Sequence, residues 1–409
     1  MQQPDNSEDT LAISGRTILQ IIPRLEAGGA ERTVIDMARA IVAAGGRAVV
    51  VAEPGRMVSE LETAGGEFIP MSAASKNPFR MLQTAVALVR LIRHQKVDLV
   101  HARSRAPAWP ALWAARWTSR PFVTTYHGIY SQTNALKAFY NSVMARGDAV
   151  IANSGMTAAL IAQRRPQAKP RIKTIYRGID MDAFAPDSIS LQRRDAVRQQ
   201  WSFQASDTNR PLILNVARLT GWKGHEVLIE AMGRLLEGNR QQNPLLILAG
   251  GSQGDSTFET HLQQLIEARG LTGHIRLVGH CDDVPAALTL ATCLVVASTR
   301  EEAFGRAAVE AGAAGIPAIA TDHGGARETI LAPPEAREDE RTGWRVPPGD
   351  AAAMADVLAT VLAMSDESRA AAGQHARNYV AARFSLEAMC TQTLRVYGAL
   401  LQTKRRTVN

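Results

Sequence analysis

Several features of common protein classes are scarce or missing in this chain of 409 residues. It has only three cysteines, and their spacing matches no metal-binding motif, so a reducing, cytoplasmic environment is expected. No apolar run is long enough to form a membrane-spanning helix. The first residues lack the basic and apolar parts of a signal peptide, and residues 1–15 are predicted to be a disordered lead-in.

The net charge of +7 is unevenly distributed along the chain. Residues 1–200 contain 26 Lys and Arg against 16 Asp and Glu, a balance of +10, whereas the remainder contains 20 against 23, a balance of −3. A basic half indicates an anionic partner. The chain lacks the interleaving of aromatic and basic residues that is typical of nucleic-acid-binding modules, so we expect no nucleic acid as a partner. We favour an anionic membrane face or an anionic acceptor.

Short apolar runs alternate with helix-length segments throughout the chain, a pattern that predicts parallel sheets built from βαβ units. The expected strands are 17–22, 48–52, 97–101, 122–126, 148–152, 212–216, 245–249, 275–278, 293–297 and 317–320. They form two series, and this predicts an α/β protein with two Rossmann-like domains.

The predicted domain organisation has five parts. After the lead-in come an N-terminal domain at 16–185, a polar linker at 186–210 and a C-terminal domain at 211–385. Residues 386–409 are expected to form one amphipathic helix and a basic tail.

Two carboxylates, Glu302 and Glu310, follow the expected strand at 293–297, and a helix is predicted to begin near Phe304. A helix start at the carboxyl end of a parallel strand favours anions. At 1.5 Å per residue the two glutamates would lie roughly 12 Å apart if both were helical. That separation suits a long ligand with hydroxyl groups at both ends and a charged centre, such as a nucleotide-diphosphate sugar.

Two cations, Arg218 and Lys223, follow the first strand of the second series on a loop that ends at Gly224. Arginine and lysine bind phosphate, so this loop could hold a diphosphate without a metal ion. Ordinary surface charges are the alternative. The position at a strand's carboxyl end favours the binding role.

In the first domain, Gly28 and Gly29 follow the first strand and open a helix, which suits close approach of a phosphate, although a plain tight turn explains them equally well. His127 ends another strand, and we expect it to contact a ligand. Asp180 and Asp182 match a metal-binding Asp-x-Asp pattern only by chance, since turn chemistry explains them.

Three further segments have weaker signals. The segment 322–329 brings glycines to a strand end, where a helix-start turn is a strong alternative. The tryptophans Trp109, Trp113 and Trp117 repeat every four residues, and at least two rings are expected to pack on the sheet. The basic, amphipathic segment 76–96 is predicted to cover a sheet, with membrane contact as the minority interpretation.

Taken together, these motifs resemble the retaining nucleotide-sugar glycosyltransferases of family 4, also called group 1, which have the GT-B fold. The resemblance extends from Leu19 to the last helix. It rests on the order and spacing of residues 28–32, 127–128, 153–154, 177–184, 218–224, 250–251, 279–280, 302–310, 324–328 and 343–346. The resemblance implies two domains that face a central cleft and a last helix that crosses back to the first domain.

The resemblance also implies roles for single residues. Arg218 and Lys223 would bind the donor diphosphate, and His127 would contact the sugar. Glu302 would hold the donor sugar together with the N–H groups that follow it, and Glu310 would accept hydrogen bonds from the ribose. The remaining donor-binding candidates are Gly28, Gly29, His280, Ala303, Phe304 and Gly305. Relatives commonly carry Asn where this chain has Arg177, which puts only the local turn in doubt.

The expected function is therefore a cytoplasmic, retaining, metal-independent hexosyltransferase that needs no cofactor. It would use a UDP- or GDP-sugar and a lipopolysaccharide or other glycan or lipid-linked acceptor, at the cytoplasmic face of the inner membrane. Two alternatives stay open: a nucleotide-sugar 2-epimerase of the same fold, for which no clear acid/base set is found, and a non-catalytic partner of a transferase.

Overall fold

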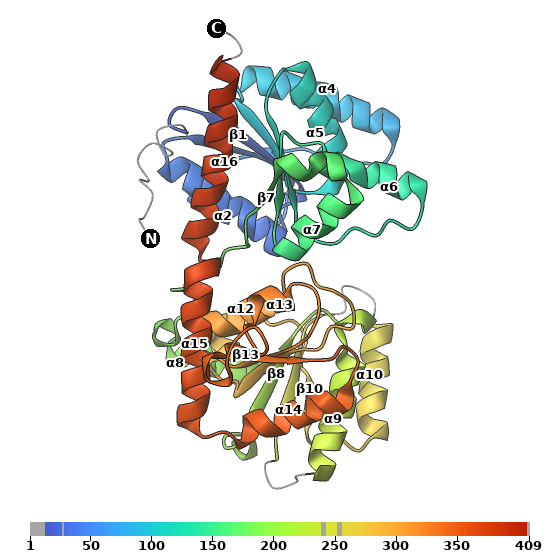
Figure 1. Cartoon of the computed structure of the whole chain (residues 1–409), viewed down its shortest axis with the longest axis vertical. Helices are drawn as coiled ribbons and strands as arrows, with labels where there is room; N and C mark the ends of the chain where they lie inside the picture. The colour runs from blue at the N-terminus through green and yellow to red at the C-terminus, as the bar shows by residue number, and fades with distance from the viewer. Residues whose placement is uncertain (1–12, 27, 239–242, 252–255, 407–409) are drawn as a thin grey trace. The chain divides into compact units, whose positions relative to one another are not determined.

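The computed structural model describes residues 13–26, 28–238, 243–251 and 256–406 (Figure 1). The chain divides into two compact units. Unit 1 comprises Met1–Gly178 and Leu386–Asn409, and unit 2 comprises Ile179–Ser385. The chain therefore leaves unit 1 once and returns to it with its last helix, as the resemblance implied.

Unit 1 contains a seven-stranded parallel sheet in the order β3-β2-β1-β4-β5-β6-β7. This order reverses between β1 and β4, and loops at such a switch point diverge to leave room for a ligand. The strands are β1 (Thr17–Arg24), β2 (Arg47–Glu53), β3 (Glu67–Pro70), β4 (Leu99–Ala102), β5 (Phe122–Tyr126), β6 (Ala149–Ala152) and β7 (Ile172–Thr174).

Unit 2 contains a six-stranded parallel sheet in the order β10-β9-β8-β11-β12-β13, with its switch point between β8 and β11. Its strands are β8 (Leu212–Val216), β9 (Leu245–Ala249), β10 (Ile275–Leu277), β11 (Cys293–Val296), β12 (Ala318–Thr321) and β13 (Gly343–Val346). The predicted pair of parallel sheets is confirmed.

Helices connect the strands in both units. Those of unit 1 are α2 (Gly29–Ala43), α3 (Val58–Thr63), α4 (Pro78–His94), α5 (Arg105–Trp117), α6 (Ala135–Asn141), α7 (Gly155–Arg164) and α16 (Leu386–Arg406). Those of unit 2 are α8 (Leu191–Gln200), α9 (His225–Gly238), α10 (Thr257–Ala268), α11 (Val284–Leu288), α12 (Arg306–Ala313), α13 (Ala326–Thr329), α14 (Ala351–Ala363) and α15 (Asp366–Phe384).

Helices α4 and α5 pack against each other on the unit 1 sheet, as predicted for residues 76–96. One face of α4 is buried through Met81, Leu88 and Ile92. The rings of Trp109 and Trp113 join the same apolar cluster, whereas Trp117 is exposed. The prediction that at least two of the three tryptophans pack on the sheet is confirmed.

The stretch 186–210, expected to be a linker, is part of unit 2. It forms α8, and Trp201 at the end of this helix is only 1% exposed. Arg193 on α8 pairs with Asp283 at 2.7 Å between Nε and Oδ2. The sequence did not predict this helix because its composition is polar. Its buried hydrophobic contacts come from Val197 and Trp201, which lie four positions apart.

Helix α16 packs beside α2 in unit 1 (Figure 1). Its Tyr397 is fully buried, and the Tyr397 hydroxyl lies 2.6 Å from Nδ1 of His101 on β4. The other ring nitrogen, Nε2, lies 2.8 Å from the Thr125 hydroxyl on β5. Burial holds the pKa of His101 well below its ordinary value, so the ring is neutral and both of its nitrogens are satisfied.

We expect Tyr397→Phe to lower the free energy of unfolding by about 1–3 kcal/mol, because it leaves a buried nitrogen of His101 without a partner. The matched control is Tyr140→Phe. The Tyr140 hydroxyl is shielded from solvent and has no partner among the described residues, so its removal should change little. Urea denaturation of both variants tests this, and equal effects would contradict it.

Candidate functional site

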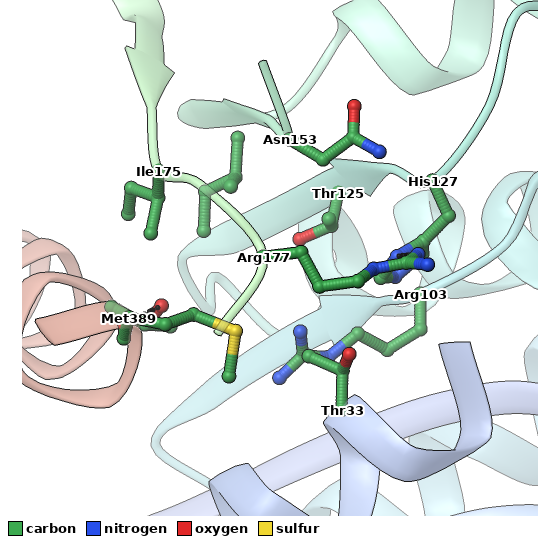
Figure 2. Close-up of a pocket in the computed structure, with 10 residues that line it drawn as sticks. Thr33, Arg103, Thr125, His127, Asn153, Ile175, Arg177 and Met389 are labelled. Carbon is green, nitrogen blue, oxygen red and sulfur yellow. Dashed lines mark hydrogen bonds between the residues drawn. The ribbon is translucent and has the colours of Figure 1, made fainter. Parts of the chain in front are cut away.

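A small polar pocket lies at the carboxyl ends of the unit 1 strands (Figure 2). The space open to the centres of water molecules is about 20 Å³, enough for one or two waters or the oxygens of one small group. The pocket is lined by Thr33, Arg103, Thr125, His127, Ile151, Asn153, Ile175, Arg177, Met389 and Thr393.

Arg103 follows β4 and is 2% exposed. Its Nε and Nη2 donate to the amide oxygen of Gln20 on β1 at 2.9 and 2.6 Å. No carboxylate of the described residues lies within salt-bridge distance of this guanidinium, although Asp36 on α2 attracts it at longer range. Burial lowers the pKa of Arg103, yet a guanidinium stays charged at neutral pH. The pocket thus contains a buried positive charge.

His127 ends β5, as predicted, and its Nδ1 lies 3.0 Å from Nη2 of Arg177. A guanidinium only donates hydrogen bonds, so Nδ1 must accept. Burial, and next the charges of Arg177 and Arg103, hold the pKa of His127 well below its ordinary value. The neutral ring therefore carries its proton on Nε2, which is shielded from solvent and has no partner among the described residues.

The sequence indicated that Arg177 affects only the local turn, and this interpretation was wrong. Its side chain extends beyond the turn, contacts His127 and lines the pocket (Figure 2). Sequence reasoning also missed Arg103 and treated Asn153 only as part of a family motif. Each directly follows a parallel strand, a position that could have marked both as candidates.

The glycines that precede α2 lie at the same edge of the unit 1 sheet. Gly28 is the N-cap of α2, and no side chain caps this helix. A Cβ on Gly28 would lie 2.5 Å from Oε2 of Glu31, so a carboxylate of the chain itself already covers this glycine. Thr33 donates to the carbonyl of Gly29 at 2.8 Å and links this turn to the pocket.

In unit 2, two of the predicted site residues form an ion pair. The Nζ of Lys223 lies 2.7 Å from Oε1 of Glu302, and the two side chains are 15% and 17% exposed. The hydroxyl of Ser298 also donates to Oε1 of Glu302. Ser298 was not predicted, although it comes two residues after β11. The structure thus joins the loops that follow β8 and β11.

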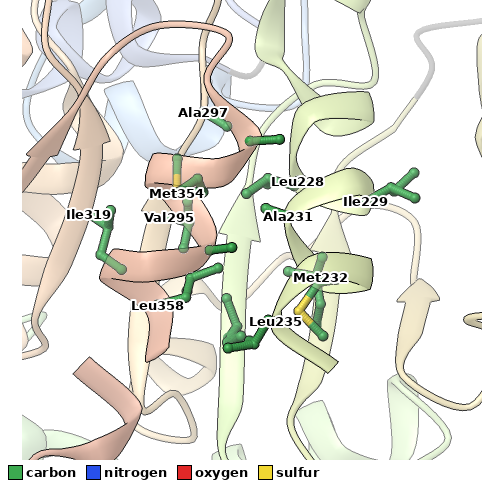
Figure 3. Close-up of a cluster of buried hydrophobic side chains, with 14 of the residues drawn as sticks. Leu228, Ile229, Ala231, Met232, Leu235, Val295, Ala297, Ile319, Met354 and Leu358 are labelled. Atoms are coloured by element: carbon green, nitrogen blue, oxygen red, sulfur yellow. The ribbon is translucent and has the colours of Figure 1, made fainter. Parts of the chain in front are cut away.

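The loop that carries Lys223 lies directly against the end of β11. Gly224 has φ 75°, and a Cβ there would overlap the carbonyl oxygen of Ala297. The N–H of Thr299 donates to the carbonyl of Trp222 at 2.8 Å. Ala297 lies at one end of the apolar core between α9 and α14 (Figure 3). Leu228, Met232 and Met354 are buried in this core. A glycine is required here because no other residue allows this approach.

The Glu302 loop is held from its other side by the glycines that follow β12. The N–H of Gly325 donates to the carbonyl of Glu302 at 2.8 Å. A Cβ on Gly324 would lie 2.6 Å from the same oxygen, and one on Gly325 would lie 2.5 Å from the Phe304 backbone. The segment 322–329 therefore positions the predicted site, which its sequence alone left undecided.

The predicted helix start near Phe304 was wrong by two residues. Helix α12 begins at Arg306, and Gly305 adopts a left-handed conformation with φ 80°. Glu302 therefore lies outside the helix, and the separation expected from helical rise does not apply. Phe304 is buried and packs edge-to-face on Phe384, with ring centroids 5.5 Å apart. Ala303, between Glu302 and Phe304, is only partly buried.

The other predicted residues of unit 2 lie on separate elements. Glu310 is buried on α12 and accepts from Nε of Arg306 at 2.6 Å. Arg218 is exposed after β8. His280 is exposed beyond β10 at the sheet edge, and its Nε2 lies 3.5 Å from Oδ1 of Asp282. Asp180 accepts from two following N–H groups, which confirms the turn interpretation.

Two family models match most of the chain. The model of glycosyl transferases group 1 matches residues 197–379, and that of glycosyltransferase family 4 matches residues 27–183. A glycosyltransferase from Rickettsia africae is 31% identical, covers 95% of this chain and 99% of its own, and superposes with a TM-score of 0.84. The chain belongs to the family 4, group 1 glycosyltransferases. Its fold is GT-B.

More distant relatives of this glycosyltransferase include proteins with named ligands. A crystal structure of Anabaena HepE in complex with UDP and glucose has a TM-score of 0.79 at 23% identity, covering 94% of this chain and 100% of that one. A D-inositol 3-phosphate glycosyltransferase of Xylanimonas cellulosilytica is 28% identical over 93% of each chain. Among the described residues, no helix is long and apolar enough to cross a membrane.

We expect Gly224→Ala to destabilise unit 2 by more than about 1 kcal/mol, because the new Cβ meets the Ala297 carbonyl and the backbone conformation disfavours it. The matched control is Gly221→Ala in the same loop, where the nearest atom is 4.0 Å away. Thermal unfolding of both variants tests the prediction. A Gly224→Ala protein as stable as its control would contradict it.

Proposed function

We propose that this glycosyltransferase moves a hexose, with retention, from a UDP- or GDP-sugar to a lipopolysaccharide or another surface-polysaccharide acceptor, without a metal ion or cofactor. The observation that carries the proposal is the Lys223–Glu302 pair at the switch point of unit 2, with Arg218 on the loop that carries Lys223. The complex of Anabaena HepE with UDP and glucose supports a nucleotide donor, and the name of the D-inositol 3-phosphate glycosyltransferase supports a hydroxyl acceptor.

The physical basis is the charge that develops on the leaving diphosphate. Cations and N–H groups that are already in position stabilise such charge, usually the largest catalytic contribution. An ammonium has three donors, and Glu302 occupies one of those of Lys223. Lys223 therefore retains donors for a phosphate while Glu302 fixes its position and accepts hydrogen bonds from a sugar.

Within the proposed retaining course, the environment of Glu302 argues against a covalent intermediate on this carboxylate. Its Oε1 accepts from both Lys223 and Ser298, and these bonds reduce its nucleophilicity. A front-face route, in which the leaving phosphate takes the acceptor's proton, requires no nucleophilic carboxylate. The cations beside the donor diphosphate would then stabilise the charge that develops as the sugar–phosphate bond breaks. The phosphate oxygen released in this way would take the acceptor's proton.

We expect Lys223→Ala to lower kcat about 10²–10³-fold, because it removes one preorganised cation from the leaving group. Arg218→Ala should act in the same direction. The matched control is Arg234→Ala on α9, an exposed arginine that pairs with Glu230. Transfer is measured with UDP- and GDP-hexoses and a lipopolysaccharide core acceptor, and NMR of the product reports its anomeric configuration.

Activity lost on addition of EDTA would contradict metal independence. An inverted product would contradict retention, and full activity of Lys223→Ala would contradict the diphosphate site. Epimerised donor without acceptor would instead identify a 2-epimerase.

The proposed place of action is the cytoplasmic membrane face, and α4 supports it. Opposite its buried face, Phe79, Leu82 and Val86 are exposed by 68, 47 and 41%. Arg90 and Arg93 continue this face toward the end of the helix, and both are exposed. Apolar and basic side chains on one helix face are typical of a helix that lies at an anionic lipid surface.

We expect the double variant Phe79→Ser and Leu82→Ser to reduce sedimentation with phosphatidylglycerol vesicles at least fivefold, because it removes apolar area from this face. The control is Leu191→Ser on α8, where an exposed leucine lies in unit 2. Neutral phosphatidylcholine vesicles should bind weakly in all cases. Equal binding of all three proteins would contradict a membrane role for α4.

A further inference from the structure

We infer that the unit 1 pocket binds an oxyanion of the acceptor, either a carboxylate or a phosphate, through Arg103, Arg177 and Asn153. The inference rests on the proposed transferase function and adds the chemical class of the acceptor. It is carried by the buried amide of Asn153, the buried charge of Arg103 and the N–H of His127, all of which line the pocket.

Asn153 supplies the first observation. Its side chain is 3% exposed and lines the pocket, and neither its amide nitrogen nor its amide oxygen has a partner among the described residues (Figure 2). Burial of an amide without hydrogen-bond partners is unfavourable, so a side chain held in this way indicates a ligand or water that completes its hydrogen bonds.

The charge of Arg103 supplies the second observation. Its hydrogen-bond partners, the amide of Gln20 and the hydroxyl of Tyr397, are uncharged, and the carboxylate of Asp36 attracts it only at longer range. A buried charge with no carboxylate in direct contact loses solvation that its hydrogen bonds restore only in part. An anion in the adjoining pocket would provide that compensation, and a neutral sugar hydroxyl would not.

The neighbouring histidine selects the same kind of ligand. Because Nδ1 of His127 accepts from Arg177, Nε2 carries the proton, and this N–H has no partner among the described residues. Two guanidinium groups, one imidazole N–H and one amide NH₂ thus surround a space large enough only for a small group. An oxyanion accepts from all of them, whereas a cation or a second donor would be repelled.

The test uses the full chain and isothermal titration calorimetry. The probes are glucuronate for a carboxylate, glucose 6-phosphate for a phosphate and glucose as the neutral comparison, with UDP titrated separately. We expect one acidic sugar to bind at least tenfold more tightly than glucose. Preference for glucuronate would identify an acidic sugar acceptor, and preference for glucose 6-phosphate a phosphorylated one.

Two substitutions locate the site. Arg177→Asn removes one of the two guanidinium groups that line the pocket and should weaken binding of the acidic sugar at least tenfold. Asn153→Asp keeps the side-chain shape, adds a negative charge and should weaken it further. The control is Arg116→Asn, which removes the same charge from the exposed end of α5 and should leave binding unchanged. UDP binding shows that each variant is folded.

Three results would overturn the inference: equal affinity for glucose and both acidic sugars, no effect of Arg177→Asn or Asn153→Asp, or displacement of the acidic sugar by UDP, which would assign the anion site to the donor diphosphate. Nucleotide binding separates this failure from that of the proposed function. A chain that binds UDP without preferring acidic sugars retains the transferase proposal, whereas one that binds no nucleotide loses it.

Discussion

Parallel strand direction is the constraint on which the sites of both units depend. Since every strand of a sheet runs the same way, every loop that follows a strand emerges at one edge. In unit 2 this brings Lys223, Ser298 and Glu302 together from loops that are separated by about 75 residues of chain (223 to 298). In unit 1 the same constraint gathers Arg103, His127 and Arg177. The sheet brings these loops to one edge, and ion pairs and hydrogen bonds then fix the positions of their side chains.

Backbone approach decides how closely these loops can meet. Gly224 lies against Ala297, and Gly324 and Gly325 lie against Glu302 and Phe304. Each contact excludes a Cβ, so glycine at these positions is a packing requirement in addition to a conformational one. The charged side chains of the unit 2 site are therefore held by three backbone segments in direct contact, which makes the Lys223–Glu302 distance a property of the fold.

The sequence predicted what depends on local pattern. Buried strands such as Phe122–Tyr126 and Leu212–Val216 appeared with their observed bounds because an apolar run marks a strand buried on both faces. The edge strands β3 and β7 have exposed positions and gave no such signal. The start of α12 was placed two residues too early because the residue pattern does not reveal the left-handed conformation of Gly305 that precedes the helix. The contact of Arg177 with His127 joins residues 50 apart, which no local pattern encodes.

The two sites use charge in different ways. In unit 2, Lys223 and Glu302 neutralise each other, and in the proposed function a diphosphate would share the ammonium with the carboxylate that keeps it in place. In unit 1, the buried guanidinium of Arg103 has neutral hydrogen-bond partners, and desolvation keeps both nearby histidines uncharged. An unbalanced cation stabilises an anion more than a paired one does, because no internal partner has to be displaced. Arg177 adds a second guanidinium to the lining of the same pocket, which increases its preference for an anion.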